Sequence, residues 1–183
     1  MAISMATYER VALEDSETQW ELVDGCLREK PGMTTPHNDA IDYLDHTLRQ
    51  QLDREQYTLR VENARLRAAE DMVFVPDLFV LPQPLRRRSR AERPTGLEVY
   101  AEPMPLVVEV WSPSTGRYDL QIKLPAYQAR GDAEIWYIHP YDRTLTAYCR
   151  QPDGAYRDTI YREGVVESAA LPGVRIELAA LFA

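Results

Sequence analysis

PLVVEVW, residues 105 to 111, is an apolar run with a single glutamate, Glu109, near its centre. Short runs of this kind, rich in valine and followed by turn residues, are typical of buried strands. A carboxylate inside such a strand is costly unless it is neutralised, paired or bound to a metal ion. The stretch therefore predicts a core strand and requires a partner for Glu109.

The residues that follow predict a helix and a second strand. Leu120, Leu124 and Tyr127 fall on one helical stripe, and Gly131 is placed to end the helix. Pro125 lacks a backbone donor, so the regular helix either begins around residue 122 or is kinked. The segment DAEIWYIHP then reads as a strand, which makes residues 105 to 139 a plausible parallel crossover.

The flanking segments complete a mixed sheet. TQWELVDGCLREKPG alternates apolar and polar residues across Asp24 and Gly25, which predicts an N-terminal hairpin. HNDAIDYLDHTLRQQLDRE is an amphipathic helix, with Thr35 or Asn38 available as its cap. Short strands and turns in the last third predict hairpins at the C-terminal end. The fold class is therefore α/β or α+β, with helices packed on a central mixed sheet.

Length and composition limit the classes of protein that fit. The 183 residues suggest one domain, 1–183, in which residues 1–18 form a peripheral segment. The net charge of −8 argues against a protein that coats nucleic acid by bulk electrostatics. Two distant cysteines, Cys26 and Cys149, are expected to be unlinked thiols. With no apolar stretch of membrane-spanning length, we expect a cytoplasmic protein without a membrane partner.

A basic cluster stands out against this acidic background. The segment PLRRRSRAER contains five arginines, from Arg86 to Arg93, between two predicted strands. We expect a solvated loop here, and a phosphate-gripping arm is the alternative.

Asp77 is a second acid in an apolar run, FVPDLFV, and Glu109 has the same setting. If the two strands are neighbours, the carboxylates repel unless a divalent cation or a shared proton lies between them. Carboxylate oxygens with a few waters suit Mg²⁺, and the backbone carbonyl of Val110 could add another oxygen. The alternative is a pair of half-exposed edge acids bonded to backbone or arginine.

Lys123 is the candidate cation for this site. The chain has only two lysines, and this one begins the helix that is expected to pack beside the Glu109 strand. Its ammonium could hold a scissile phosphate, or it could position or deprotonate an attacking water.

These blocks resemble a known family. They are WELVDGCL, His37 opening the first long helix, PD at Asp77, PLVVEVWSPST, RYDLQIKLPAYQARG, EIWYIHP and LPGVRIELAALF. In this series of blocks, which occur in the same order, the chain resembles the Uma-two family of restriction-endonuclease-like proteins. The resemblance extends from about Trp20 to the end of the chain. It implies the PD-(D/E)XK nuclease superfamily, with a mixed central sheet flanked by helices and Mg²⁺-dependent cleavage of phosphodiester bonds.

The resemblance also implies roles for single residues. Asp77 would be the acid of the PD element and Glu109 the second metal ligand, with Lys123 in place of the superfamily lysine. That lysine usually follows the second acid by two residues, where this chain has Trp111. Glu21 would be the N-terminal acid of the site, although an exposed hairpin glutamate is equally compatible with the spacing.

Two more polar residues could approach this site. His37 either enters the pocket or caps the first long helix, and we expect the second. Asp119 is expected to cap the helix that carries Lys123.

The leading functional expectation is a DNA endonuclease that uses Mg²⁺, with Mn²⁺ as the alternative ion. The alternative is a catalytically weak or inactive protein with the same fold that acts as a dimeric binding or accessory module. Because cleavage of both strands of a duplex needs two sites, a homodimer is expected.

Overall fold

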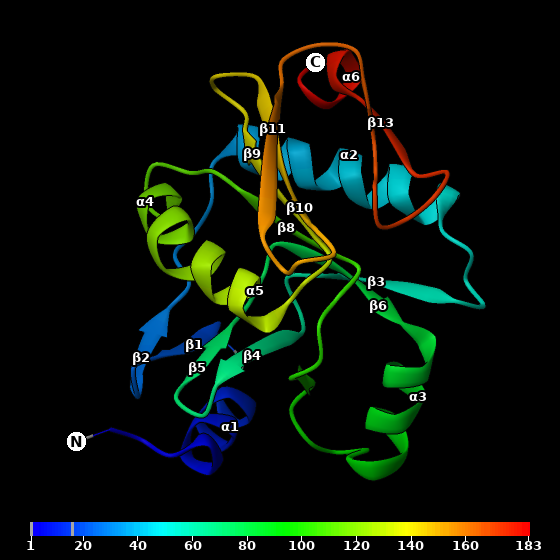
Figure 1. Ribbon diagram of the computed structural model, residues 1–183. Helices are drawn as coiled ribbons and strands as arrows, with labels where there is room; N and C mark the ends of the chain where they lie inside the picture. Colours follow the sequence, from blue (N-terminus) through cyan, green and yellow to red (C-terminus); the bar gives the residue numbers. More distant parts are fainter. Residues whose placement is uncertain (1, 16) are drawn as a thin grey trace.

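A computed structural model describes residues 2–15 and 17–183 of the chain (Figure 1). Its helical elements are α1 (Met5–Glu14), α2 (Thr35–Gln51), α3 (Gln83–Glu92), α4 (Gly116–Tyr118), the π-helical turn η1 (Asp119–Lys123), α5 (Leu124–Arg130) and α6 (Leu178–Leu181). Its strands are β1 (Trp20–Val23), β2 (Cys26–Glu29), β3 (Tyr57–Val61), β4 (Arg65–Ala69), β5 (Met72–Phe74), β6 (Leu78–Pro82), β7 (Val99–Tyr100), β8 (Leu106–Val110), β9 (Glu134–His139), β10 (Thr144–Arg150), β11 (Tyr156–Tyr161), β12 (Val165–Glu167) and β13 (Arg175–Glu177).

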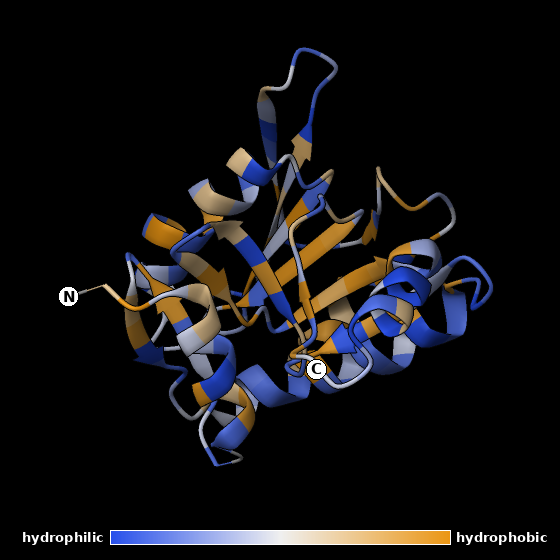
Figure 2. Ribbon diagram, turned by 90° about the horizontal axis from the view of Figure 1, so that it is seen from below, coloured by the Kyte–Doolittle hydropathy of each residue, from blue (hydrophilic) through white to orange (hydrophobic). Residues whose placement is uncertain are grey.

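The main sheet is mixed and has the strand order β11-β10-β9-β8-β6-β3. Strands β8 and β9 are parallel, and the other neighbours in this sheet are antiparallel. The segment from α4 to α5 connects the two parallel strands, as the sequence predicts. Apolar residues concentrate in the strands, whereas the loops and outer helix surfaces are mostly hydrophilic (Figure 2). The predicted fold class is confirmed.

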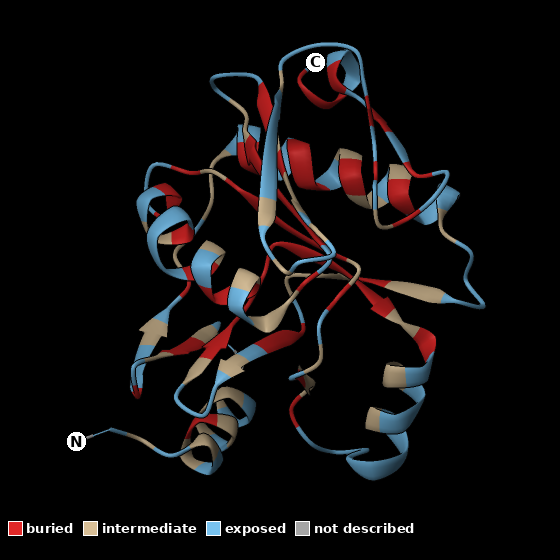
Figure 3. Cartoon of the chain, in the orientation of Figure 1, coloured by how far each residue is buried: buried red, intermediate tan, exposed pale blue. Residues whose placement is uncertain are grey.

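Two cores lie on opposite faces of the main sheet. On one face, α2 packs its apolar side against alternate residues of the central strands, including Val108 and Val110. On the other face, α5 and the smaller sheet cover the intervening residues, among them Val107 and Phe79. The central strands are buried on both faces (Figure 3), which explains why PLVVEVW is apolar at consecutive positions.

The smaller sheet, β2-β1-β5-β4-β7, carries the N-terminal hairpin. Asp24 and Gly25 form its turn, both with positive φ, which confirms the predicted hairpin. Helix α1 packs here and buries Tyr8 completely, with Leu22 and Val73 in the same cluster. Residues 5–14, expected to be peripheral, thus contribute to a small core of their own.

The predicted helix caps are wrong in detail. The residue that precedes α2 is Thr34, not Thr35 or Asn38, and its side chain makes no capping bond. Proline in the first turn supports this helix start instead, because its missing N–H would have had no partner there.

The arginine cluster is a helix and not the expected loop. Residues 83–92 form α3, with Pro84 in its first turn. Most of this helix is exposed or half-buried (Figure 3), and Leu85 is its one large aliphatic side chain. Because the helix buries so little apolar surface, its sequence lacks the periodic pattern by which helices are predicted.

Pro125 is accommodated by a change of helix type. Residues 119–123 form a π-helical turn, and α5 begins at Leu124 with the proline in its first turn. The wider turn rotates the residues before it, so Leu120 is 40% exposed whereas Tyr127 is fully buried. The predicted stripe through both residues is therefore wrong.

None of the helices in the described part of the chain is long and apolar enough to cross a membrane.

Candidate active site

Four carboxylates and a lysine from separate parts of the chain meet between the two sheets. Glu21 comes from β1, Asp77 directly precedes β6, Glu109 lies on β8, and Asp119 and Lys123 lie on the π-helical turn. Each of the five residues is at most 3% exposed. The structure thus brings together all four predicted catalytic residues, namely Asp77, Glu109, Lys123 and Glu21.

Strand geometry directs Glu109 into this space. Successive side chains of a strand point to opposite faces, so Glu109 shares the α5 face with Val107, while Val108 and Val110 face α2. Tyr127 of α5 donates a hydrogen bond to Glu109 Oε1 at 2.6 Å. Glu109 is thus held by the helix that the parallel crossover places over β8.

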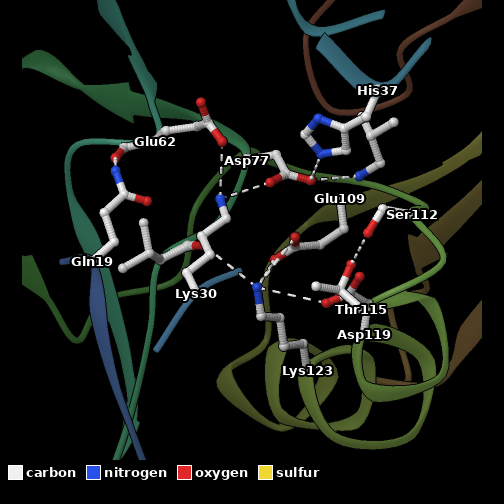
Figure 4. A network of polar contacts seen from close by, with 12 residues as sticks. Gln19, Lys30, His37, Glu62, Asp77, Glu109, Ser112, Thr115, Asp119 and Lys123 are labelled. Carbon is white, nitrogen blue, oxygen red and sulfur yellow. Dashed lines mark hydrogen bonds and ion pairs between the residues drawn. The ribbon is translucent and has the colours of Figure 1, made fainter. Parts of the chain in front are cut away.

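Lys123 is the centre of the acid cluster (Figure 4). Its Nζ lies 3.0 Å from Glu21 Oε1 and 3.2 Å from Glu109 Oε1. Asp119 Oδ1 is 3.6 Å away, one π-helical turn earlier in the chain. Asp119 makes no capping bond as the residue preceding a helix, so the expectation that it caps a helix is wrong. The lysine therefore reaches the cluster from the turn before α5. The position two residues after Glu109, where the resemblance leads one to expect a lysine, holds another residue.

Trp111 occupies that strand position. Its ring stacks on His139 with centroids 4.3 Å apart, outside the acid cluster. A Cβ atom at Gly116 would overlap the Trp111 ring, so glycine is required there for the indole to pack. The residue two positions after Glu109 is therefore part of the packing at the strand end.

Asp77 has three hydrogen-bond donors. Lys30 Nζ lies 2.7 Å from Oδ1, and Oδ2 accepts from the backbone N–H of Val110 at 2.7 Å. His37 Nε2 lies 3.1 Å from the same Oδ2 (Figure 4). His37 is fully buried and contacts the site, so the expectation that it only caps the helix is wrong. The described contact of Val110 is made by its N–H, and its carbonyl as a metal ligand stays a prediction.

Glu21 is a buried member of the site and not an exposed hairpin residue. Its Oε1 accepts from the backbone N–H of Val75, whose carbonyl is 3.4 Å from Lys123 Nζ. Its Oε2 accepts from the Tyr118 hydroxyl at 3.0 Å. Arg28 lies at 3.5 Å from the same oxygen. The acid therefore joins β1 to the β5–β6 connection and to the helical segment.

The pKa values of the two predicted metal ligands, Asp77 and Glu109, are shifted in opposite directions. Burial alone would raise the pKa of Asp77, but Lys30 and His37 hold it well below its usual range. Burial raises the pKa of Glu109, and repulsion from Asp77 adds to this although Lys123 opposes it. Burial favours a neutral Lys123, yet the surrounding carboxylates outweigh it and raise its pKa. At neutral pH, Asp77 is therefore ionised and Lys123 is a cation.

The donor set suits a hard divalent cation, although it forms no ready cage. Within residues 2–15 and 17–183, no three His, Cys, Asp or Glu side chains are grouped to hold a metal ion. Mg²⁺ is commonly held by one or two carboxylates, with water and substrate phosphate in its remaining positions. Asp119 Oδ1 is buried without a hydrogen-bond partner, and its nearest cation is Lys123 at 3.6 Å. Asp77 and Glu109 therefore fit such an ion, with Lys30 as the present counter-ion of Asp77.

Sequence reasoning missed Lys30 and Tyr127 as members of this site. Lys30 follows β2 and has a side chain only 4% exposed, paired with Asp77 and with Glu62 at 3.2 Å. The available signal was the lysine count, because both lysines of the chain lie in this one cluster while the other cations are arginines. Tyr127 was predicted only as an apolar helix residue.

A cavity leads from the surface to the Lys30 side of the site. It has a volume of about 410 Å³ and is lined by Lys30, Glu62, Asn38 and the segments 17–19 and 29–33. A ligand in this cavity would meet the Lys30 ammonium before it met Asp77.

Comparison with known proteins agrees with this architecture. In structure, the chain is similar to a protein from Anabaena variabilis described as "a putative nuclease belonging to DUF820", with 18% sequence identity, a TM-score of 0.75, and 98% of this chain and 97% of that chain covered. This likeness shows a shared fold. No curated protein matches the chain. Residues 5–180 match the Uma2 family, described as "Putative restriction endonuclease". Because the match spans nearly the whole chain, the protein belongs to the Uma2 family.

Proposed function

We propose that this protein is a Mg²⁺-dependent endonuclease that hydrolyses phosphodiester bonds in DNA. The family description and the shared fold support a nuclease-like function in general. The observation that carries the finer proposal is the buried pair Asp77 and Glu109 beside the cationic Lys123. Mn²⁺ would serve the same oxygen ligands.

Each residue has a distinct task in this proposal. Asp77 and Glu109 would hold the metal ion, which supplies neutralisation of negative charge and activation of a water when bound. In hydrolysis, a water oxygen bonds to phosphorus while the bond to the leaving oxygen breaks, and negative charge grows on the phosphoryl oxygens. Lys123 remains protonated, so its task is to attract the phosphate and stabilise that charge. Glu21 orients Lys123 through their 3.0 Å contact.

A second candidate function is a binding module with the same fold that does not cut. It is favoured by the contacts of the acids, because Lys30 and Lys123 already neutralise Asp77 and Glu109. In that case the cluster would be a structural ion-pair network.

Calorimetric titration with Mg²⁺ and Mn²⁺, run beside a plasmid-cleavage assay, separates the two functions. The endonuclease proposal requires saturable binding and cation-dependent cleavage in the parent, and loss of both in Glu109→Gln. Glu167→Gln removes the same charge from an exposed pair with Arg175 and serves as the control. Cleavage that persists in Glu109→Gln contradicts the assignment, and a parent that binds DNA without cutting it supports the module.

We also propose that the enzyme acts as a homodimer, because a double-strand cut requires two active sites. Light scattering of the purified protein tests this, and a monomer in the presence of DNA contradicts it.

A further inference from the structure

Helix α3 gathers arginines on one side. Residues three and four positions apart share one face of a helix, so Arg86, Ser89 and Arg90 lie on the same side of α3, and Arg93 follows directly after the helix. Arg87 and Arg88 lie on other sides of the helix. The linear cluster is therefore divided by the helix into groups that face different surroundings.

The first group faces a cavity of about 270 Å³. The cavity lies between α3, β3 and the segment before β7, and its lining residues are Arg60, Arg86, Ser89, Arg90, Arg93, Pro94, Gly96, Glu98 and Tyr100. Four of these side chains are guanidinium groups and one is a carboxylate. We call this cavity the arginine pocket.

The single carboxylate is already neutralised. Glu98 lies 2.8 Å from the Arg60 guanidinium and accepts a hydrogen bond from the Tyr100 hydroxyl at 2.6 Å. Arg93 is paired outside the pocket with Glu9 at 2.5 Å. In the described part of the chain, neither Arg86 nor Arg90 has a carboxylate partner, and the nearest polar contact of Arg86 is the neutral Gln83 at 3.3 Å. The arginine pocket therefore carries unbalanced positive charge.

A second hollow beside the same helix lacks this imbalance. It is lined by Arg67, Arg88 and Arg93 together with Glu9, Glu92 and Glu102, so acids and bases are equal in number. Arg88 is paired with Glu102. A surplus of positive charge is thus a property of one face of α3 and not of the whole arginine-rich segment.

We propose that the arginine pocket binds a backbone phosphate of nucleic acid at a distance from the active site. Guanidinium groups match phosphate oxygens with paired hydrogen bonds, and the cavity is open to solvent and lined by four of them. The choice of nucleic acid as the ligand rests on the proposed function.

The position of the pocket supports an extended ligand. Arg60 in the pocket comes two residues before Glu62, which contacts Lys30 at the active site. Two residues of extended chain span at most about 7 Å. A polyanion lying along the β3 edge of the main sheet could therefore contact both places, and the pocket would set its register on the protein.

The test compares two double variants of α3 with equal loss of charge. Arg86→Gln/Arg90→Gln empties the pocket of its unpaired cations, and Arg87→Gln/Arg88→Gln removes two arginines from the other sides of the same helix. Fluorescence anisotropy measures binding of a labelled DNA duplex in EDTA at several salt concentrations. We expect the pocket variant to bind about tenfold more weakly. Its log–log salt slope should fall by about 2, while the control stays near the parent.

Three results would overturn the proposal. They are equal weakening in both double variants, no DNA binding by the parent at low salt, and displacement of DNA by pyrophosphate at concentrations that indicate a free polyphosphate as the better ligand. Because the assay contains EDTA, it does not depend on cleavage. If the pocket variant alone loses DNA binding and the parent does not cleave DNA, the endonuclease proposal fails and the pocket proposal stands. If the parent cleaves DNA and the pocket variant binds and cleaves it equally well, only the pocket proposal fails.

Discussion

Replacing Asp77 by asparagine should destabilise the protein far more than the matched change at Glu109. Asp77 uses both carboxylate oxygens to accept from Lys30, His37 and the Val110 N–H. An asparagine has one carbonyl oxygen, and its amide group would point a donor at another donor.

The magnitude follows from burial. The side chains of Lys30 and Asp77 are only 4% and 2% exposed, so the variant leaves a largely buried ammonium without its closest anion, with Glu62 as its remaining partner. Breaking a buried pair in this way costs about 3–5 kcal/mol. A protein of ordinary stability would still fold, but with much of its margin lost.

Glu109→Gln should be milder. The pKa of Glu109 is raised by burial, so a neutral side chain suits this position better than it suits Asp77. The glutamine oxygen can still accept from Tyr127, while Lys123 keeps its contacts with Glu21. We expect a loss of about 1 kcal/mol, the scale of one hydrogen bond.

Urea unfolding at pH 7 in EDTA, followed by circular dichroism, measures both variants. The free energy of unfolding should fall in Asp77→Asn by at least twice the loss in Glu109→Gln. Equal losses, or a larger loss at Glu109, would show that the Lys30 pair does not carry the stability assigned to it.

Three further predictions concern the same region. Because the pKa of Asp77 is depressed in the folded state, its stabilising effect is present above its ordinary pKa of 3.8 and is lost as the pH falls below that value. The free energy of unfolding should therefore fall more steeply with acid in the parent than in Asp77→Asn, and identical pH profiles would contradict this. Lys30→Met removes the counter-ion of Asp77 and should tighten Mn²⁺ binding in calorimetry, and weaker binding would argue that Lys30 supports the ligand set. Gly116→Ala forces the Trp111 ring to move, with an expected cost of about 1–3 kcal/mol and a change in tryptophan fluorescence; an unchanged emission spectrum would refute the overlap.

Local patterns were sufficient to predict much of the fold. The strand at 106–110, the hairpin at Asp24 and Gly25 and the crossover to β9 were predicted correctly, because each depends on periodicity and turn residues within one segment. The mixed sheet followed from their order. Helix α3 was missed because its residues bury little apolar surface, so no hydrophobic pattern distinguishes it from a loop.

Site residues could be predicted from the sequence only where an acid interrupts an apolar strand segment. Asp77 and Glu109 stand out because charge is unusual in an apolar strand. Lys30 and His37 lie in polar segments where a cation is ordinary, and only the tertiary fold places them against Asp77. The contrast between the pKa shifts of the two acids could not be predicted either, because Lys30 and His37 are distant from Asp77 in the sequence and only the tertiary fold brings them to it.

The burial of both lysines also determines how the protein meets amine-selective reagents. Lys30 and Lys123 are the only lysines in the chain, and both side chains are at most 4% exposed. Acylation of either ε-amine therefore requires both that the reagent reaches the buried nitrogen and that the amine has lost its proton. Peptide mapping after timed acylation would measure how often this happens, and the protein needs no engineered label to report it.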